Sequence, residues 1–298
     1  MKRFWIGVAA AFAVSACSGG NPFTEETDTE NGGLVPEIIA GDLEGITYDP
    51  VAQTLVVRGV SLDDTPFESV YRRRPSLDRG GYEAYTAQDS SLDQHSTAYV
   101  RDINGTRAAV VVTGGQFENY FGGATYGRSG GFDPVDVTST SGQVSYAGNY
   151  IGLTNLPGDG GDLLPVAPGT PTEIRPGQAG EVTGRVLVNA DFADNVVQGG
   201  VFQRVYVDNP GTNLEDLAFE PSAIDPATGS FTGNVTINLQ ERGTYGGIFG
   251  GTNAEAVAGA LFVEDHIDGI DDEEEYGIFV LTQCGTPGED PLCNQPVP

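Results

Sequence analysis

Few side chains in this sequence could do catalytic chemistry. The histidines are His95 and His266, and neither lies in a pattern that pairs a nucleophile with its base. A hydrolytic triad needs that base within hydrogen-bond reach of the nucleophile, and no Gly-x-Ser-x-Gly elbow occurs. The single lysine is Lys2, which excludes a Schiff-base or P-loop lysine further along the chain. The sequence therefore predicts no catalytic residues, no cofactor and a protein that is not an enzyme.

Candidate metal ligands gather between positions 265 and 275, where seven acidic residues occur. Hard cations such as Ca²⁺ are bound by several converging carboxylates, which makes this run a weak calcium candidate. The candidate ligands are Asp265, Asp268, Asp271 and Asp272. Their spacing departs from the EF-hand loop, which has acids at alternate positions and a glycine at the sixth. The sequence favours the alternative, a solvated loop in an acidic protein, and no metal site is expected.

The charge of the chain excludes some partners. It has 42 Asp and Glu against 14 Lys and Arg, a formal charge of −28. Affinity for nucleic acid depends on basic contacts to phosphate, so no nucleic-acid partner is expected. Three consecutive arginines, Arg72, Arg73 and Arg74, stand out against this background. In a strand Arg72 and Arg74 would share one face. The triplet meets either the protein's own carboxylates or an acidic patch on a partner.

The start of the chain indicates export and lipidation. Lys2 and Arg3 precede an apolar stretch, Phe4 to Val14, that is too short to span a bilayer. The run from Val14 to Cys17 resembles the bacterial lipobox: a branched apolar residue, two small ones, then cysteine. We therefore predict that residues 1–16 are a lipoprotein signal peptide and that Cys17 is acylated, with palmitate for example. The alternative is an ordinary cleaved signal with an incidental cysteine.

The residues that follow Cys17 predict how the protein is held. Several acyl chains on one residue anchor it to a membrane more firmly than a single chain. Ser18, rather than Asp, resembles the outer-membrane sorting pattern, so we expect an outer-membrane, lipid-anchored protein. Residues 17–40 are expected to form the anchor and a flexible tether, because their polar, acidic start cannot bury a core. The remaining cysteines, Cys284 and Cys293, are expected to form a disulfide after export, the alternative being a free or metal-bound pair.

The rest of the chain predicts an all-β protein. Residues 41–135 form a small β-rich domain, in which Asn104-Gly105 between two β-rich runs predicts a hairpin. Residues 136–298 show alternating apolar and polar positions and predict eight antiparallel strands that close into a barrel with a filled interior. The predicted strands are Gln143–Thr154, Glu181–Phe192, Val196–Val207, Leu217–Ile224, Ser230–Leu239, Gly243–Phe249, Ala256–Glu264 and Glu274–Thr282. A membrane-spanning barrel is disfavoured, because an integral barrel does not need a lipid anchor.

One hairpin of the barrel region carries a family resemblance. Gly243 to Phe262, GTYGGIFGGTNAEAVAGALF, resembles the signature hairpin of the transferrin-binding protein B barrel domains. The corresponding residues are Phe249, Gly250, Asn253, Ala254, Glu255, Ala258 and Gly259. Gly251-Thr252 departs from the family pattern. Other strands between Gly142 and Gln283 resemble the family in the same order, and this region is about half of the chain.

The resemblance implies a surface-exposed outer-membrane lipoprotein with a β-rich handle before its barrel. It implies a monomeric, single-lobe member that captures a protein or cofactor ligand, such as a host or environmental iron or haem protein, and hands it to an outer-membrane transporter. Transferrin-binding members are usually two-lobed and larger, which weakens transferrin as the ligand.

Two other functions remain open at this point. One is a structural or protective envelope lipoprotein without a specific ligand, and the other is a lipocalin-like carrier with an apolar barrel cavity. A long segment rich in Gly and Pro, Asn155 to Gln178, is either a partner-binding surface loop or a tolerated insertion.

Overall fold

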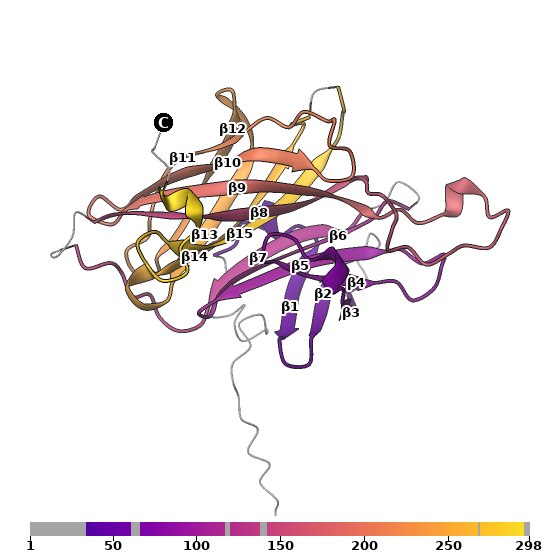
Figure 1. The fold of residues 1–298 in the computed structure, drawn as a ribbon, viewed down its shortest axis with the longest axis horizontal. Helices are drawn as coiled ribbons and strands as arrows, with labels where there is room; N and C mark the ends of the chain where they lie inside the picture. The colour runs from indigo at the N-terminus through magenta and orange to yellow at the C-terminus, as the bar shows by residue number, and fades with distance from the viewer. Residues whose placement is uncertain (1–33, 61–65, 117–119, 138–141, 268, 295–298) are drawn as a thin grey trace, which may run out of the picture.

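The computed structural model describes residues 34–60, 66–116, 120–137, 142–267 and 269–294. The predicted signal peptide, the lipidated Cys17 and the calcium candidate Asp268 lie outside the described residues. Two β-sheets make up the described part of the chain, one below the other in Figure 1. Within that part, no helix has both the length and the apolar character needed to cross a bilayer.

The first sheet, which we call the handle, is antiparallel and runs in chain order from β1 to β7. Its strands are β1 (Leu43–Asp49), β2 (Thr54–Val60), β3 (Pro66–Arg73), β4 (Glu83–Ala87), β5 (Ser96–Ile103), β6 (Thr106–Thr113) and β7 (Gly122–Arg128). Asn104 and Gly105 both have positive φ, 53° and 79°, in the tight turn between β5 and β6. The predicted hairpin is therefore confirmed, with the backbone geometry that selects Asn-Gly.

The short helix α2 (Glu37–Ala40) lies between the two ends of the handle sheet. Asp42, which follows it, donates its backbone N–H to Gly122 O at 3.0 Å, and Ile39 is fully buried. Gly41 has φ 55°, and a Cβ there would lie 2.3 Å from Gly122 O. This close approach requires glycine. The segment thus joins β7 to the start of β1 and leaves the handle nearly closed.

The second sheet is the predicted closed barrel, with the order β10-β11-β12-β13-β14-β15-β8-β9. Its strands are β8 (Gln143–Pro157), β9 (Ala179–Asp191), β10 (Val196–Tyr206), β11 (Leu217–Ala223), β12 (Ser230–Ile237), β13 (Gln240–Gly250), β14 (Ala256–Glu264) and β15 (Glu274–Gln283). The predicted fold class is confirmed. Several predicted boundaries shift by one to three residues, such as the start of β13 at Gln240 instead of Gly243. β12 ends before Asn238 and Leu239, because both have positive φ and form the turn into β13. Cys284 and Cys293 form the predicted disulfide, with Cα atoms 5.4 Å apart.

The barrel interior is filled by large side chains. Aromatic rings from different strands meet there at centroid distances of 4.6–6.1 Å, for example Phe219 with Tyr245 and Phe231 with Phe249. Tyr146, Phe249 and Phe279 are essentially without exposed surface. Eight strands enclose a space that side chains can just fill. The barrel is therefore a packed core.

The handle and the barrel share a second hydrophobic core. Strands β6 and β7 pack across the outside of β13–β15 and β8, with residues of both sheets in one buried cluster. Tyr82, which precedes β4 of the handle, is buried in this contact. Its hydroxyl donates to Asn149 O at 2.7 Å and accepts from Val280 N–H at 3.0 Å.

The position of the Tyr82 hydroxyl coincides with a break in the barrel ladder. Strands β15 and β8 pair at Phe279 with Tyr150 and again at Thr282 with Ala147, in unchanged register. Between these pairs, the Val280 N–H and the Asn149 carbonyl bond to the hydroxyl instead. Buried backbone groups need a partner, so the handle completes the hydrogen bonding of the barrel wall.

Replacing Tyr82 with phenylalanine keeps the ring and removes the bridge. We expect Tyr82→Phe to lower the free energy of unfolding by about 1–3 kcal/mol, because the buried N–H of Val280 and the half-buried carbonyl of Asn149 lose their partner. Urea unfolding followed by circular dichroism measures this. The matched control is Tyr120→Phe, at an exposed tyrosine, which should change stability by no more than about 0.5 kcal/mol. Equal effects of the two substitutions would contradict the bridging role.

Candidate functional site at the loop end of the barrel

Four connections of the barrel come together at one of its ends, which we call the loop end. They are residues 158–178, 207–216, 238–239 and 265–273. The longest, residues 158–178 between β8 and β9, we call the arm. Figure 1 shows the arm projecting beyond the body of the molecule at the right of the view. It contains most of the segment that the sequence marks as a candidate binding loop.

The outgoing limb of the arm is fixed to the handle through Asp162. One carboxylate oxygen lies 3.1 Å from His95 Nε2 and the other lies 3.2 Å from Arg74 Nε. Two residues further on, the Leu164 N–H donates to Gln88 Oε1 at 2.8 Å. His95, Arg74 and Gln88 all belong to the handle or its connections. The outgoing limb of the arm therefore begins at barrel strand β8 and is held by the handle.

The returning limb is fixed to the handle as well. Gln116 donates its side-chain amide to Ile174 O at 3.0 Å, and Gly177 N–H donates to Gly115 O at 2.8 Å. A Cβ on Gly114 would lie 2.0 Å from Gly177 O. No side chain fits at this backbone crossing, so the glycine is required there. Both limbs are thus clamped, which leaves the tip between them to project.

The tip has its own internal order. Thr170 N–H donates to Ala167 O at 3.2 Å, and Gly169 has φ 85° after Pro168, which fits a type II turn. Arg175 Nε donates to Thr170 O at 3.0 Å. A short 3₁₀ turn, η2 (Thr172–Ile174), follows. The Arg175 guanidinium therefore stabilises the turn at residues 167–170 through a contact within the arm.

His95 at the arm base has no catalytic geometry. Burial lowers the pKa of His95, and the carboxylate of Asp162 opposes this shift. Its Nδ1 is buried and has no hydrogen-bond partner. The hydrogen bonds of His95 and of His266 both go to carboxylates, and no hydroxyl or thiol of the described residues is hydrogen-bonded to either ring. The expectation that the protein is not an enzyme remains a prediction.

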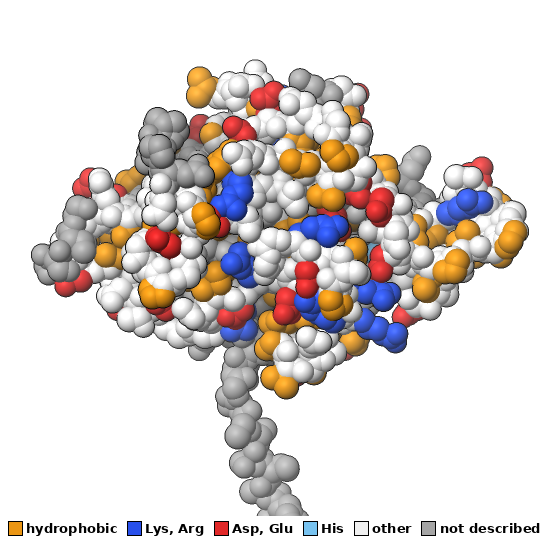
Figure 2. All heavy atoms as spheres, viewed as in Figure 1, with side chains coloured by type: hydrophobic (Ala, Val, Ile, Leu, Met, Phe, Trp, Pro, Cys, Tyr) orange, Lys and Arg blue, Asp and Glu red, His pale blue; other side chains and the backbone are white. Residues whose placement is uncertain are grey.

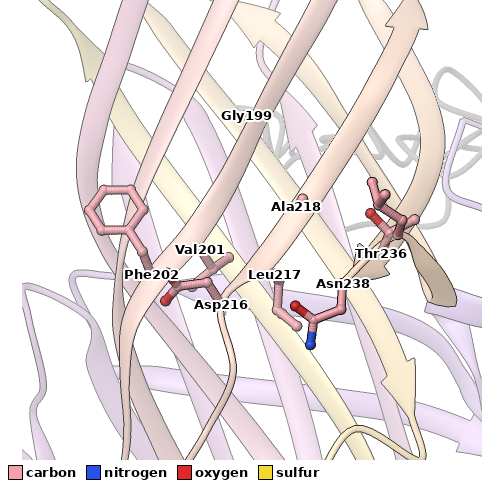
Figure 3. A pocket seen from close by; sticks show the side chains of 9 residues that line it. Gly199, Val201, Phe202, Asp216, Leu217, Ala218, Thr236 and Asn238 are labelled. Carbon is pink, nitrogen blue, oxygen red and sulfur yellow. The ribbon is translucent and has the colours of Figure 1, made fainter. Parts of the chain in front are cut away.

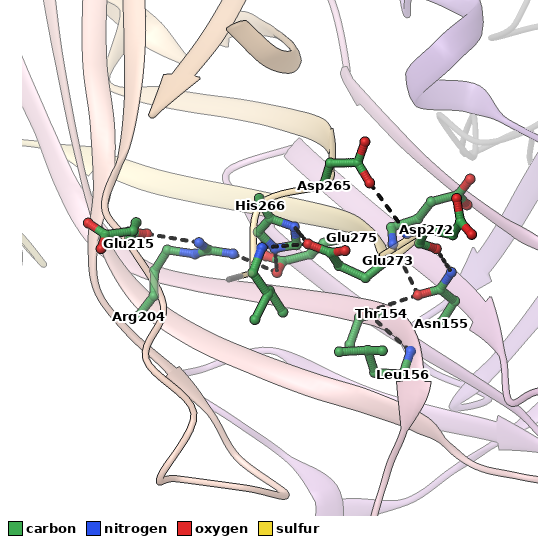
Figure 4. Close-up of polar contacts among 12 residues, drawn as sticks. Thr154, Asn155, Leu156, Arg204, Glu215, Asp265, His266, Asp272, Glu273 and Glu275 are labelled. Atoms are coloured by element: carbon green, nitrogen blue, oxygen red, sulfur yellow. Dashed lines mark hydrogen bonds and ion pairs between the residues drawn. The ribbon is translucent and has the colours of Figure 1, made fainter. Parts of the chain in front are cut away.

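A charged cluster is buried inside the barrel beneath the loop end (Figure 4). Arg204 Nη2 donates to Glu275 Oε2 at 2.6 Å, and His266 Nε2 lies 3.0 Å from the same oxygen. The hydroxyl of Tyr150 donates to the other oxygen of Glu275. The side chains of Arg204, Glu275 and His266 have no exposed surface. Burial alone would raise the pKa of Glu275, but Arg204, His266 and Tyr150 lower it to about 2.

The connection between β14 and β15 folds into this cluster. Glu273 is buried, accepts the backbone N–H of Ile267 at 2.5 Å and lies 3.5 Å from His266 Nδ1. Ile267 joins the barrel core. The interpretation of positions 265–275 as a solvated acidic loop was therefore wrong for Glu273, Glu275 and His266. The alternation along β15 places Glu275 on the same inward face as Phe279, and this signal could have identified it.

The calcium candidates lie on the outside of the same connection. Asp265, Asp271 and Asp272 are exposed, and Asp272 N–H donates to Asp265 Oδ1 at 3.3 Å. Among the described residues no group of three or more His, Cys, Asp or Glu could hold a metal ion. With Asp268 outside the described residues, the weak calcium site remains an untested prediction.

Two residues of the arginine triplet form ion pairs within the protein, and the third is exposed. Arg73 pairs with Asp78 at 2.5 Å, and Arg74 pairs with Asp162 in the arm base. Arg72 is exposed on the other side of the strand from buried Tyr71. The protein's own carboxylates therefore take two of the three. A partner-binding role stays a prediction, for Arg72 above all.

A shallow groove lies on the barrel beside β11 (Figure 3). Its lining includes Val201 and Phe202 of β10, Leu217 and Ala218 of β11, and Asn238 of the β12–β13 turn. Binding sites for small molecules combine an enclosed apolar pocket with a few convergent polar groups. This open groove lacks such convergence, and we assign no ligand to it.

Comparisons with known proteins give a likeness of fold alone. A scan of protein-family models and a search of curated proteins find no match. A double mutant of Transferrin Binding Protein B (TbpB) from Haemophilus parasuis Hp5 is similar over 80% of this chain and 53% of that chain, with 13% identity and a TM-score of 0.40. Intact Ap-TbpB, with N and C lobes, is similar over 81% and 54%, with 11% identity and a TM-score of 0.38. A surface lipoprotein is similar over 79% and 94%, with 15% identity and a TM-score of 0.35.

These structures include the family that the hairpin residues resemble. The chain spans about half the length of the two TbpB structures.

The buried carboxylate of Glu275 should make stability depend on pH. Its folded-state pKa of about 2 lies below the ordinary glutamate value. The ionised form therefore stabilises the fold above the unfolded pKa, and this stabilisation is lost as pH falls from about 5 to about 2. We expect Glu275→Gln to reduce the slope of unfolding free energy against pH over that range, measured by urea unfolding. Glu220→Gln, at an exposed glutamate, is the control and should leave the slope nearly unchanged. An identical slope in all three proteins would contradict the assignment.

Loss of the Asp162 charge should loosen the arm. In Asp162→Asn the contacts with His95 and Arg74 are weakened, so we expect amide exchange in residues 158–178 to become about five- to tenfold faster, corresponding to about 1 kcal/mol. Hydrogen–deuterium exchange with mass spectrometry measures this. Asp194→Asn, on an exposed turn at the other end of the barrel, should leave exchange in the arm unchanged. Unchanged exchange in Asp162→Asn would mean that Asp162 does not hold the limb.

Proposed function

We propose that this protein is a lipid-anchored lipoprotein of the bacterial surface that captures a protein ligand at the loop end of its barrel. The observation that carries the proposal is the filled barrel interior. Carriers of small apolar molecules enclose their ligand in a cavity, whereas rings such as those of Phe231, Tyr245 and Phe249 occupy this barrel. A ligand therefore has to meet the outer surface, which suits a protein better than a small molecule.

The scarcity of exposed side chains that could ligate haem iron also favours a protein ligand over free haem. Haem iron is held in proteins by His, Cys, Met or Tyr. Among the described residues both histidines are buried against carboxylates, and Cys284 and Cys293 are joined in a disulfide. That part of the chain thus offers no exposed histidine, methionine or free thiol, and Tyr120 is its one exposed tyrosine. By the family resemblance, a protein that carries iron or haem is the first kind of ligand to test, with an outer-membrane transporter as its recipient.

The start of the described chain fits a tethered body. Tyr126 of the handle donates its hydroxyl to Leu34 O at 2.6 Å, and Leu34 packs against the core shared by the two sheets. A lipid on Cys17 would therefore hold the molecule through the junction of handle and barrel. Since the chain is strongly acidic, we expect the anionic membrane surface to repel the folded body and keep it extended from the bilayer.

Binding to intact cells tests capture and display together. Cells that express the full chain are incubated with fluorescently labelled haemoglobin and transferrin, and with free haemin. We expect one of the labelled proteins to bind, and the binding to disappear after proteinase K treatment of the intact cells. We expect the purified chain not to bind free haemin. Cys17→Ala, which removes the acylated thiol, is the matched control and should not display the protein. Stoichiometric binding of haemin or a fatty acid, without capture of either protein, would contradict the proposal and favour a carrier.

A further inference from the structure

The tip of the arm differs from the rest of the surface in its chemistry. Residues 163–172 have the sequence LLPVAPGTPT, without one charged side chain in a chain of charge −28. Leu164, Pro165, Ala167, Pro168 and Pro171 are exposed. None of the three hydrophobic cores includes a residue of this stretch. Figure 2 shows hydrophobic side chains gathered on the projecting arm at the right edge of the view.

The tip is also held in one shape before any partner arrives. Its turn is closed by the hydrogen bond from Thr170 N–H to Ala167 O, and Arg175 secures it from the returning limb. The two limbs are clamped to the handle at Asp162 and Gly177. Exposed apolar groups that are ordered in advance lose little conformational entropy on binding. A projecting, proline-containing turn that is already formed suits insertion into a groove.

Exposed carboxylates border the base of the arm. Asp159 lies in its first turn, and the Asp159 N–H donates to Asp208 Oδ1 of the neighbouring connection at 2.9 Å. Asn155 donates to Asp272 O at 3.0 Å, which places the exposed Asp265, Asp271 and Asp272 beside the same end of β8. Arg204 at this end is buried and already paired with Glu275. The exposed basic side chains here are Arg175, on the returning limb, and Arg74, which is paired with Asp162. The exposed carboxylates outnumber them, so a partner would meet an uncharged tip with a border that is acidic on balance.

We propose that the tip of the arm, residues 164–171, inserts into an apolar groove on a protein partner, and that basic side chains flank this groove. The inference rests on the proposed function and names the surface and the kind of partner. The apolar insertion governs how long the complex lasts, because packed contacts act mainly on dissociation. The acidic border governs how fast it forms, because complementary charges at the edge of an interface steer association.

Matched substitutions separate these two roles. Ala167→Asp places a charge on the inserted tip. Ala227→Asp makes the same change on an exposed turn at the opposite end of the barrel, in the β11–β12 connection. The combined change Asp265→Asn and Asp271→Asn removes two charges from the border. Thermal unfolding of each variant checks that the fold is kept, and a photo-crosslinking amino acid at position 167 or 227 reports contact directly.

The probes are purified haemoglobin and transferrin, together with secreted and detergent-solubilised outer-membrane proteins of the bacterium that encodes the chain. We expect a protein that cross-links from position 167 and not from 227. Its complex should dissociate at least tenfold faster in Ala167→Asp and at the original rate in Ala227→Asp. The border variant should associate severalfold more slowly at low salt, with a weaker dependence on ionic strength and an unchanged dissociation rate.

Three other results would overturn the inference, and they separate the role of the arm from protein capture. Capture of a protein by the original chain and by Ala167→Asp with equal dissociation rates, or cross-linking from position 227 alone, overturns the role of the arm and leaves protein capture standing. Absence of any captured protein overturns the inference together with the proposed function.

Discussion

A tyrosine hydroxyl from the handle lies inside the hydrogen-bond ladder of the barrel. Tyr82 takes the place of a strand partner for Asn149 of β8 and Val280 of β15. Both backbone groups are in the buried contact between the sheets, where an unpaired N–H or carbonyl would be costly. The barrel wall is thus completed by a residue of the other sheet. The shared core on either side of Tyr82 then fixes the orientation of the handle relative to the barrel.

The fixed orientation determines what the loop end presents. The arm leaves the barrel between β8 and β9, yet its limbs are held by His95, Gly115 and their neighbours in the handle. The direction in which the tip projects is therefore fixed as long as the two sheets keep their relative positions. Beneath the arm, the charged cluster around Glu275 and the inserted Ile267 hold the β14–β15 connection in the barrel mouth. A rigid scaffold with an ordered, projecting loop is a common arrangement for binding a partner.

The sequence predicts the strands well and the contacts between distant strands poorly. Alternation with a period of two identifies the barrel strands, and Asn104-Gly105 identifies a hairpin, because both signals are local. The inward position of Arg204 could not be found this way. Gln203 has φ 53° at a register shift of β10, and this bulge turns Arg204 into the barrel. The composition of residues 155–178 marks a loop, but its clamps join residues far apart in the chain, as does the bond from Val280 to Tyr82.

Handle and barrel share so many buried contacts that we expect them to unfold as one cooperative body. Calorimetry of the lipid-free chain should then show a single transition whose calorimetric enthalpy equals its van't Hoff enthalpy. Two separate transitions, or a calorimetric enthalpy well above the van't Hoff value, would show that the two sheets unfold separately and would contradict this expectation.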